Sequence, residues 1–332
     1  MPVNRRIVLA SRPAGWPTEA NFRLVEAEVP QPQDAEVVVR NHYLSLDPYM
    51  RVRMDDVRSY AKPVEIGGVM EGETVGEVIA SPSERFKPGD FVRGRMGWQE
   101  YGCAPEALLT RVDAQRAPLS LYLGALGMPG VTGWVGLVDI CAPKAGETVV
   151  VSAASGAVGS VVGQLAKKRG CRTVGIAGGA AKCRYVVDEL GFDACVDYKA
   201  GRVQEDLRAA LPAGCDVLFE NVGGEGLDAM LRLMTAHSRI AICGLISQYN
   251  ATEPYGYRNL RSVLVNRIRM QGFIVSDRME LWKPALAELG ELHAQGRLKY
   301  RESIAEGLAS APRAFIGMLR GENFGKQLVK LV

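Results

Sequence analysis

The sequence predicts an α/β protein in which a β-rich, partly closed barrel is joined to a doubly wound parallel sheet. Strand-like runs broken by Pro, Gly and Asp turns fill roughly the first 125 residues. From about residue 129 onward, strand-like and helix-like segments alternate, which is typical of a parallel sheet with helices on both faces. The chain of 332 residues is also long for one hydrophobic core, so two domains are expected.

Five runs in the first part have the composition of β-strands. Each is rich in apolar β-branched or aromatic residues, and turn sequences such as KPGD (residues 87–90) separate them. Short strands with such turns favour a barrel over a parallel sheet. The expected strands cover residues 6–9, 22–25, 36–40, 74–79 and 90–93.

The second part begins with a helix expected at residues 133–140, after which strands and helices alternate. Further strands are expected at residues 172–177, 194–197, 216–220, 239–243 and 270–275, and helices at 181–190, 226–234, 259–265 and 279–294. The last 35 or so residues have mixed character and end in a strand-like run at 327–332. We therefore expect domains at residues 1–125 and 126–296, with residues 297–332 returning to the first.

A strand, a tight turn and a helix are expected in succession from Thr148 to Gly170. A buried apolar run leads into the small residues Ala154, Gly156 and Gly159, and helical apolar spacing then continues until Gly170 ends the helix. In the dinucleotide pattern GxGxxG, the small residues permit a sharp turn, close approach of a diphosphate, and close helix–strand packing. Here alanine stands at the first position. An ordinary strand-to-helix turn is the alternative, and the flanking strand and helix favour a nucleotide site.

The end of the second strand indicates which dinucleotide binds. An NAD site needs Asp or Glu about 20 residues after the glycines, where the carboxylate accepts a hydrogen bond from the ribose 2′-OH. This chain has Gly178 and Gly179 there, followed by Lys182 and Arg184. A cation without a neighbouring carboxylate suits a 2′-phosphate, so NADP(H) is favoured over NAD(H). The alternative is that Lys182 is a solvated helix lysine.

The composition excludes several classes of protein. The 40 Lys and Arg against 37 Asp and Glu give a net charge of +3, too small to predict nucleic acid or an acidic surface as a partner. No apolar run is long enough for a membrane span, and the N-terminus lacks the pattern of a signal peptide, so a cytoplasmic protein is expected. The seven cysteines stand singly, which is typical of reduced thiols.

Several separated segments resemble the zinc-independent medium-chain reductases, a family that includes prostaglandin reductase (leukotriene hydroxydehydrogenase), plant double-bond reductases and bacterial curcumin reductase. The resemblance runs essentially end to end. It rests on LDPYMR (residues 46–51), AASGAVGSVVGQ (153–164), FENVGG (219–224), AICGLISQYN (241–250), GFIV (272–275) and GENFGK (321–326). It implies a GroES-like barrel with a Rossmann sheet, and NADPH-dependent reduction of the C=C bond of α,β-unsaturated ketones and aldehydes. Two departures are small: Glu220 stands where animal members often have Asp, and Gln248 matches the plant members better.

The resemblance also implies where the cofactor and substrate bind. The diphosphate is expected on Gly156, Ala157, Val158 and Gly159. The 2′-phosphate is expected at Gly178, Lys182 and Tyr198. The nicotinamide half is expected among Asn221, Cys243, Gly244, Ile246, Ser247, Tyr249, Phe273, Ile274, Val275 and Asn323, with Tyr49 lining the substrate pocket from the other domain.

No bound metal is expected. Zinc-dependent relatives carry a His-Glu pair after a glycine and a lobe of four cysteines, whereas the corresponding segment here reads GGVMEG (residues 67–72). The three histidines, His42, His237 and His293, are far apart in the sequence, and no cysteine cluster offers a tetrahedral thiolate site.

Without zinc, hydroxyl groups must stabilise the enolate that forms when a hydride reaches the β-carbon. Tyr249 and Tyr49 are the candidates beside the cofactor's own ribose hydroxyl, and a tyrosine or water is expected to protonate the α-carbon. Tyr249 is preferred because it follows the fifth strand of the sheet at its carboxyl end. Two alternatives remain open: Tyr49 as a core aromatic residue, and Tyr249 as a ligand of the ribose only.

Two other functions compete with enone reduction: a non-catalytic nucleotide-binding protein of the lens-crystallin kind, and an NADP-dependent alcohol or hydroxy-eicosanoid dehydrogenase. The presence of both candidate tyrosines argues against the first. Residues 55–65 and 250–260, the latter with Tyr255 and Tyr257, are expected to shape the substrate pocket. The family also leads us to expect a homodimer that pairs sheet edges near residues 270–275.

Overall fold

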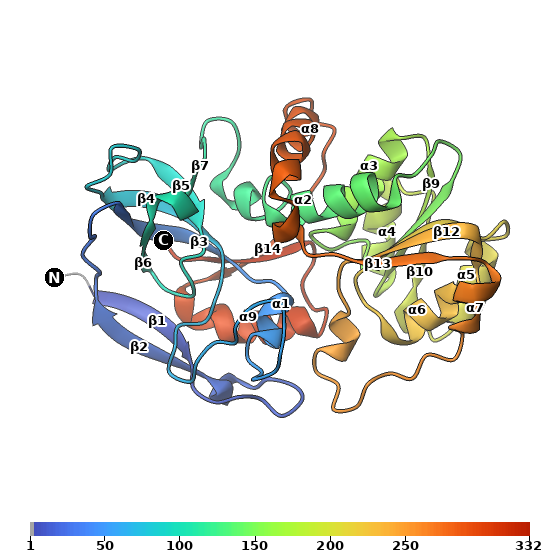
Figure 1. The fold of residues 1–332 in the computed structure, drawn as a ribbon, viewed down its shortest axis with the longest axis horizontal. Helices are drawn as coiled ribbons and strands as arrows, with labels where there is room; N and C mark the ends of the chain where they lie inside the picture. The colour runs from blue at the N-terminus through green and yellow to red at the C-terminus, as the bar shows by residue number, and fades with distance from the viewer. Residues whose placement is uncertain (1–2) are drawn as a thin grey trace. The chain divides into compact units, whose positions relative to one another are not determined.

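The computed structural model describes residues 3–332, which divide into two compact units (Figure 1). Unit 1 consists of Met1–Gly124 and Glu302–Val332, and unit 2 of Ala125–Arg301. The C-terminal segment therefore belongs to the same unit as the N-terminal part of the chain.

Unit 2 is built on a six-stranded parallel sheet in the order β10-β9-β8-β11-β12-β13. Its strands are β8 (Thr148–Ser152), β9 (Arg172–Ala177), β10 (Ala194–Asp197), β11 (Cys215–Glu220), β12 (Met234–Ile242) and β13 (Arg269–Gly272). The apolar run at residues 149–151 is fully buried, as expected for a central strand covered on both faces. The strand order reverses between β8 and β11, and nucleotides bind at the carboxyl ends of such a reversal. The predicted doubly wound sheet is confirmed.

Helices cover both faces of this sheet. They are α2 (Met128–Trp134), α3 (Gly159–Lys168), α4 (Ala180–Asp188), α5 (Val203–Ala210), α6 (Gly224–Leu231), α7 (Arg261–Val265) and α8 (Trp282–Ala294). Helix α2 packs against α3 and α8, whereas α5 packs against α6 (Figure 1). On the α5–α6 face, Val150, Val174, Leu218 and Ile240 from four adjacent strands form one core with Leu207 of α5.

The helix expected at residues 133–140 differs from the prediction in its start and in its winding. It begins at Met128 as α2 and continues as a π-helix, Val135–Cys141. A β-carbon at Gly136 would lie 2.5 Å from the Phe219 ring and 2.8 Å from the Phe273 ring. The glycine in the widened turn therefore leaves room for two aromatic rings.

The strand expected at residues 270–275 is shorter than predicted. Strand β13 ends at Gly272, and the chain then continues in a 3-10 helix, Val275–Leu281. The Phe273 ring packs edge-on against Phe219 with 6.4 Å between centroids. Because Phe273 packs inward, the chain leaves the sheet after Gly272 and does not continue as an extended strand.

Unit 1 contains a mainly antiparallel sheet in the order β14-β15-β3-β4-β5-β7, with β6 paired to β3 and a separate ribbon of β1 and β2. Strand β3 pairs with β6 in its first half and with β15 at its end, so the sheet curves into the predicted partly closed barrel. Parallel strands β14 and β15 come from the C-terminal segment. The bounds are β1 (Val3–Leu9), β2 (Phe22–Glu28), β3 (Glu36–Ser45), α1 (Tyr49–Val52), β4 (Thr74–Ala80), β5 (Phe91–Gly94), β6 (Tyr101–Pro105), β7 (Thr110–Arg111), β14 (Glu302–Glu306), α9 (Ala311–Leu319) and β15 (Lys326–Lys330).

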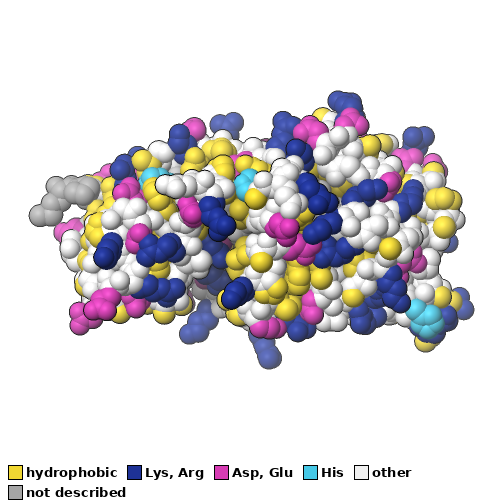
Figure 2. Space-filling view, turned by 90° about the horizontal axis from the view of Figure 1, so that it is seen from above, with side chains coloured by type: hydrophobic (Ala, Val, Ile, Leu, Met, Phe, Trp, Pro, Cys, Tyr) yellow, Lys and Arg dark blue, Asp and Glu magenta, His cyan; other side chains and the backbone are white. Residues whose placement is uncertain are grey.

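The surface carries charges of both signs. On the face drawn in Figure 2, Lys and Arg side chains are interspersed with Asp and Glu and with apolar side chains. Within residues 3–332, no helix combines the length and the apolar character that crossing a membrane requires.

Candidate cofactor and active site

The turn between β8 and α3 brings backbone N–H groups to the carboxyl edge of the sheet. Gly156 donates its N–H to the carbonyl of Ala153 at 2.9 Å, which closes a tight turn. A β-carbon at Gly159 would collide with that same carbonyl, so glycine lets α3 start this close to the strand. The first N–H groups of an α-helix have no partner within the helix and lie at the positive end of its dipole. Residues 157–159, where α3 begins, therefore suit a diphosphate.

Ala154 occupies the first small position of the pattern because the neighbouring strand makes room for it. Ala154 is fully buried, and a β-carbon built at Gly175 of β9 would lie 2.9 Å from the Ala154 β-carbon. The left-handed conformation of the turn belongs to Ala153, whose φ is 50°. Glycine is therefore not required at position 154.

The ends of β9 and β10 meet beside this turn. Gly178 follows β9 and Tyr198 follows β10, and a β-carbon at Gly178 would lie 2.8 Å from the Tyr198 ring. The ring lies against the Gly178 backbone and is 49% exposed. Asp197 holds this arrangement, because its Oδ1 accepts the N–H of Gly179 at 2.7 Å and that of Lys199 at 2.9 Å.

Lys182 lies in the first turn of α4, directly after these strand ends. Its side chain is half-buried, and burial, followed by the positive charge of Lys199, lowers the pKa of Lys182 below its ordinary value. Burial and a neighbouring positive charge both disfavour the charged form of a lysine. A bound anion offsets both of these effects and therefore stabilises the charged form strongly. Lys182 and Lys199 therefore make this corner suitable for a phosphate group.

A buried carboxylate holds the ends of β8 and β11 together. Glu220 is 1% exposed, and its Oε1 accepts hydrogen bonds from the Ser152 hydroxyl and from the N–H of Gly223, both at 2.8 Å. Burial raises the pKa of Glu220, and these donors oppose the rise. Asn221 donates its side-chain amide to the Ser152 carbonyl at 2.8 Å and its N–H to the Ser152 hydroxyl at 2.7 Å. The network fixes Asn221 beside the dinucleotide turn.

The segment 243–249 folds over the ends of β11 and β12. Cys243 donates its N–H to the Glu220 carbonyl at 2.8 Å, and Ile246 donates its N–H to the Asn221 carbonyl at 3.2 Å. Burial, with the charge of Glu220, raises the pKa of Cys243 to about 12. The thiol is therefore protonated at neutral pH and is not a nucleophile.

The phenol group of Tyr249, at the end of this segment, folds back onto the backbone of the segment. Its hydroxyl accepts the N–H of Leu245 at 3.3 Å, and a β-carbon at Gly244 would lie 3.1 Å from the same oxygen. Ser247 contributes a second tie, from its hydroxyl to the Val222 carbonyl at 2.6 Å. The Tyr249 hydroxyl thus lies beside the backbone that follows β12, at the carboxyl edge of the sheet.

Phe273, Ile274 and Val275 follow β13 at the same edge. The Phe273 ring points inward onto Phe219, as described above, so its backbone is the part that remains at the edge. The Val275 carbonyl accepts a hydrogen bond from the Trp282 indole at 3.2 Å, and this bond anchors the segment to the start of α8.

A single carboxylate ties residues 250–260 to α6. Asp228 accepts the backbone N–H of Asn259 at 3.0 Å and its side-chain amide at 3.1 Å. The rings of Tyr255 and Tyr257 pack edge to face with 5.1 Å between centroids. The loop that is expected to shape the substrate pocket is therefore held by specific contacts.

Tyr49 begins the short helix α1 in unit 1. Burial, followed by the charge of Asp47, raises the pKa of Tyr49 above its ordinary value. The Arg53 guanidinium, on a residue that is 3% exposed, lies 5.9 Å from the centroid of the Tyr49 ring and 4.4 Å from that of Tyr60. Arg53 thereby joins Tyr49 to residues 55–65, and the phenol remains protonated.

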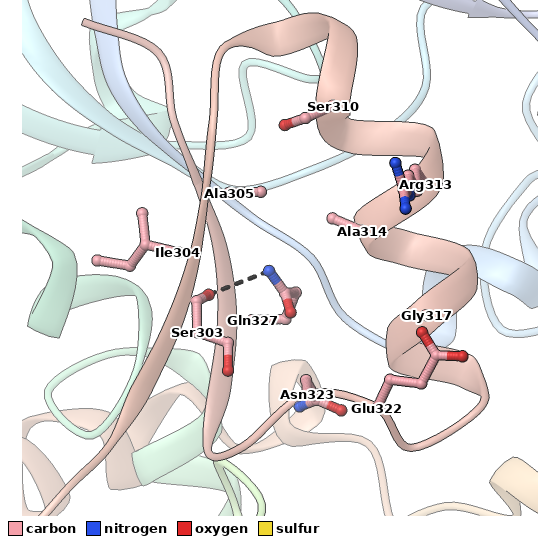
Figure 3. A pocket seen from close by; sticks show the side chains of 10 residues that line it. All are labelled: Ser303, Ile304, Ala305, Ser310, Arg313, Ala314, Gly317, Glu322, Asn323 and Gln327. Atoms are coloured by element: carbon pink, nitrogen blue, oxygen red, sulfur yellow. Dashed lines mark hydrogen bonds between the residues drawn. The ribbon is translucent and has the colours of Figure 1, made fainter.

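Asn323 lines a hollow of about 340 Å³ in unit 1 (Figure 3). The hollow lies between α9, which contributes Arg313, and the strands β14 and β15. Gln327 of β15 donates its side-chain amide to the Ser303 carbonyl of β14 at 3.0 Å. The Asn323 amide donates to the Gly325 carbonyl at 2.8 Å, which fixes the bend before β15.

The structure gathers the predicted residues of unit 2 along one edge of its sheet. Tyr49 and Asn323 belong to unit 1 and are described there by themselves. In unit 2, five strands each have a predicted residue as the first after their carboxyl end. In the spatial order of the strands these are Tyr198, Gly178, then the turn after β8, then Asn221, Cys243 and Phe273.

Three residues that organise this edge do not appear among the predicted site residues. Ser152, Asp197 and Glu220 are each the last residue of a strand, and each accepts or donates the hydrogen bonds that shape the following loop. A polar residue that closes a buried apolar run is the signal by which they could be found.

The described part of the chain contains no cluster of side chains that could ligate a metal. Residues 3–332 contain no group of three or more His, Cys, Asp and Glu side chains arranged to hold a metal ion.

In this doubly wound sheet, a turn of small residues lies where the strand order reverses. This combination is typical of the class of dinucleotide-binding proteins. Comparison with known proteins is more specific. A family described as "N-terminal domain of oxidoreductase" matches residues 5–112, and one described as "Zinc-binding dehydrogenase" matches residues 157–291. The NADPH-dependent curcumin reductase of Escherichia coli (strain K12) is 48% identical over 99% of this chain and 97% of its own. The 2-alkenal reductase (NADP(+)-dependent) of Nicotiana tabacum is 43% identical over 98% and 97%.

A solved structure gives the same result. CurA from Vibrio vulnificus in complex with NADPH is 47% identical, with a TM-score of 0.95 and coverage of 99% of both chains. The chain belongs to the zinc-independent enone reductase branch of the medium-chain dehydrogenase/reductase family. The resemblance inferred from the sequence segments is thereby confirmed.

Proposed function

We propose that this protein is an NADPH-dependent reductase of the C=C bond in α,β-unsaturated ketones and aldehydes. Its relatives named curcumin reductase and 2-alkenal reductase support this class of reaction, since they match nearly the whole chain. The substrate is a small molecule, and the reaction places one hydride on the β-carbon and one proton on the α-carbon.

One observation carries the proposal: the order of the predicted residues along the sheet edge follows the order of the groups in NADPH. Residues that suit a 2′-phosphate follow β9 and β10, and the turn that suits a diphosphate follows β8. The residues expected at the nicotinamide follow β11, β12 and β13, on the other side of that turn. An extended dinucleotide bound across the point of reversal meets these groups in the same sequence.

The residues present fit NADP(H). The amino end of α3 would hold the diphosphate, and Gly159 lets this end lie close to the turn after β8. Lys182 would meet the 2′-phosphate beside Tyr198, and the Ser152–Asn221 network would hold the amide of Asn221 near the nicotinamide half. The favoured cofactor is therefore NADP(H) over NAD(H).

When bound, NADPH supplies the hydride for the β-carbon. Tyr249 and Tyr49 each offer a hydroxyl to the substrate's carbonyl oxygen, whose negative charge grows as the enolate forms. Burial keeps Tyr49 protonated, so it can donate a hydrogen bond at neutral pH. The α-carbon takes its proton from a tyrosine or from water, and no metal is needed as a Lewis acid.

A panel of enones, enals and quinones tests this function. Loss of nicotinamide absorbance is followed with NADPH and with NADH, and the product is identified by mass and by its retained carbonyl group. We expect NADPH consumption with enones and enals, a saturated carbonyl product, and activity that survives dialysis against a chelator. Reduction of the carbonyl group to an alcohol, or oxidation of alcohols with NADP⁺ as the faster reaction, would contradict the proposal.

The sheet edge at β13 is suited to a homodimer. Strand β13 is the last strand in the order and has no second neighbour in the described sheet. Nearby apolar side chains are exposed, with Leu264 at 79% and Met270 at 37%. An open strand edge next to exposed apolar groups pairs readily with a copy of itself.

A further inference from the structure

Lys326 forms a buried ion pair with Asp47 inside unit 1. The two side chains are 4% and 8% exposed, and 2.6 Å separates Nζ from Oδ1. The same Nζ donates to the Leu46 carbonyl at 2.8 Å, and the Ser45 hydroxyl donates to the other oxygen of Asp47. Such pairs contribute little net stability, because both charges lose their hydration. The groups that this ion pair contacts therefore indicate its role in the fold.

The pair holds the turn from which α1 starts. The Asp47 carbonyl accepts the N–H of Met50 at 3.1 Å, and the Pro48 carbonyl accepts that of Arg51 at 3.1 Å. Tyr49 lies inside this turn, so its direction depends on where residues 46–48 are held. Lys326 contacts two successive residues directly before Pro48, one through its carbonyl and one through its carboxylate.

Lys326 is itself well placed to hold the turn, because it opens β15. This strand pairs with the end of β3, and the N–H of Leu46 donates to the Gln327 carbonyl at 3.1 Å. Asn323, the candidate cofactor residue of unit 1, lies three residues before Lys326 and is fixed by its bond to Gly325. The start of β15 thus supports Tyr49, the candidate substrate residue, and directly follows the segment that contains Asn323, the candidate cofactor residue.

We infer that Lys326 is a positioning residue for Tyr49: its ammonium group fixes the carbonyl of Leu46 and the carboxylate of Asp47, and thereby the place of the Tyr49 hydroxyl during enone reduction. This inference rests on the proposed function. Lys326 acts through Asp47 and Leu46, since these are the groups that its Nζ contacts. The negative charge of Asp47 also raises the pKa of Tyr49, and Lys326 balances that charge.

A double-variant experiment separates positioning from stability. Lys326→Met alone leaves Asp47 buried and unpaired, so the melting temperature should fall. Asp47→Asn combined with Lys326→Met removes both charges and should recover most of that loss. The double variant should nevertheless keep a kcat with an enone about tenfold or more below the parent, because a displaced hydroxyl no longer meets the carbonyl oxygen. Its KM for NADPH should change far less than kcat, since the residues expected at both phosphate groups lie in unit 2 and Asn323 is fixed by its own bond to the Gly325 carbonyl.

The matched control is the ion pair of Glu147 and Arg239 in unit 2, whose side chains are 20% and 17% exposed. Glu147 directly precedes β8, and Arg239 of β12 pairs with Arg269, the first residue of β13, so both lie away from the carboxyl edge. Glu147→Gln with Arg239→Met should leave kcat unchanged. A double variant of Asp47 and Lys326 whose kcat recovers together with its melting temperature would overturn the inference.

A readout that does not depend on activity distinguishes this inference from the proposed function. Fluorotyrosine is placed at position 49, and the ¹⁹F resonance is compared between the parent and the Asp47→Asn, Lys326→Met double variant. A shifted or broadened resonance is expected, with no change in the Glu147 and Arg239 control. If the double variant does not fold, Ser45→Ala and Lys326→Arg give the same comparison. An unchanged resonance in the folded variants overturns the inference, whereas an inactive parent enzyme overturns the proposed function.

Discussion

A glycine and a tyrosine share one space where the second and third strands of the parallel sheet end. The Tyr198 ring lies where a side chain at Gly178 would be, so the backbone and the ring together form a flat wall beside Lys182. The absence of a carboxylate at Gly178 and the presence of Lys182 were both readable in the sequence. The contact with Tyr198 was not, because it joins residues on two different strands.

Substitution of Lys182 tests the choice of cofactor. Lys182→Ala should raise the KM for NADPH by about 10- to 100-fold, because a charge-assisted bond to the 2′-phosphate is lost. The KM for NADH, which lacks that phosphate, should change little. Steady-state kinetics with both cofactors measure the difference, and Lys167→Ala, at the far end of α3, is the control. Equal changes for the two cofactors would show that the phosphate lies elsewhere.

Substitution of Tyr249 tests the stabilisation of the enolate. Tyr249→Phe keeps the ring and removes the hydroxyl, so kcat with an enone should fall by about 10- to 100-fold. The KM for NADPH should move much less. Tyr122→Phe, whose hydroxyl donates to the Asp113 carbonyl in unit 1, is the control. If kcat with Tyr249→Phe equals that of the parent, Tyr249 has no part in the chemistry.

At the scale of elements, one carboxylate joins three helices of unit 2. Glu288 of α8 accepts hydrogen bonds from the Trp134 indole of α2 at 2.7 Å and from Lys168 of α3 at 2.9 Å. It also accepts one from Arg169 at 3.0 Å, just beyond the end of α3. The helices that cover one face of the sheet are therefore fastened to each other at this point.

This junction gives a stability prediction with a defined dependence on pH. Burial opposes ionisation, but the bonds from Lys168, Trp134 and Arg169 prevail and lower the pKa of Glu288 to about 2. A lowered pKa stabilises the fold fully above the ordinary value of 4.5, and this contribution is lost as pH falls towards 2. Glu288→Gln should therefore cost about 1–3 kcal/mol at neutral pH.

Thermal melting across pH measures this contribution. The difference in melting temperature between the parent and Glu288→Gln should be largest at neutral pH and should narrow as pH falls through the acid range. Glu291→Gln, on the same helix, is the control, because its carboxylate accepts a hydrogen bond from the exposed side chain of Gln295. A difference that is constant with pH would mean that the charge of Glu288 contributes nothing.

The sequence predicted the elements whose signal is local and missed those set by packing. The strand at residues 149–151 is a fully buried apolar run, so its position was plain. Helix α5 is an exception: it was not predicted, although Val203, Leu207 and Ala210 recur at helical spacing and pack in one core. The π-turn at Gly136 and the early end of β13 both depend on where the Phe219 and Phe273 rings meet. A contact between residues so far apart in the chain has no local pattern.

At the scale of the whole molecule, the exposed edge of the parallel sheet predicts self-association. Light scattering should give a mass near twice the 36.0 kDa of one chain. Charges of one sign introduced at the edge, as in Leu264→Glu with Met270→Glu, should lower the mass towards that of one chain, because they repel each other and disfavour pairing of apolar strand edges. Leu108→Glu, at an exposed position of unit 1, is the control. A parent protein that scatters as a single chain would rule out the dimer.

Ala154, in the turn after β8, faces Gly175 of β9, and the space between them has room for one methyl group. The turn stays tight because the neighbouring strand has glycine at position 175, opposite the alanine at position 154. In other proteins of this fold the two positions should therefore change in concert: glycine in the turn frees the next strand to carry alanine, and the reverse. A dinucleotide turn with alanine at its first position then relieves the same steric crowding as one with glycine. It can be recognised only when the turn and the adjacent strand are compared together.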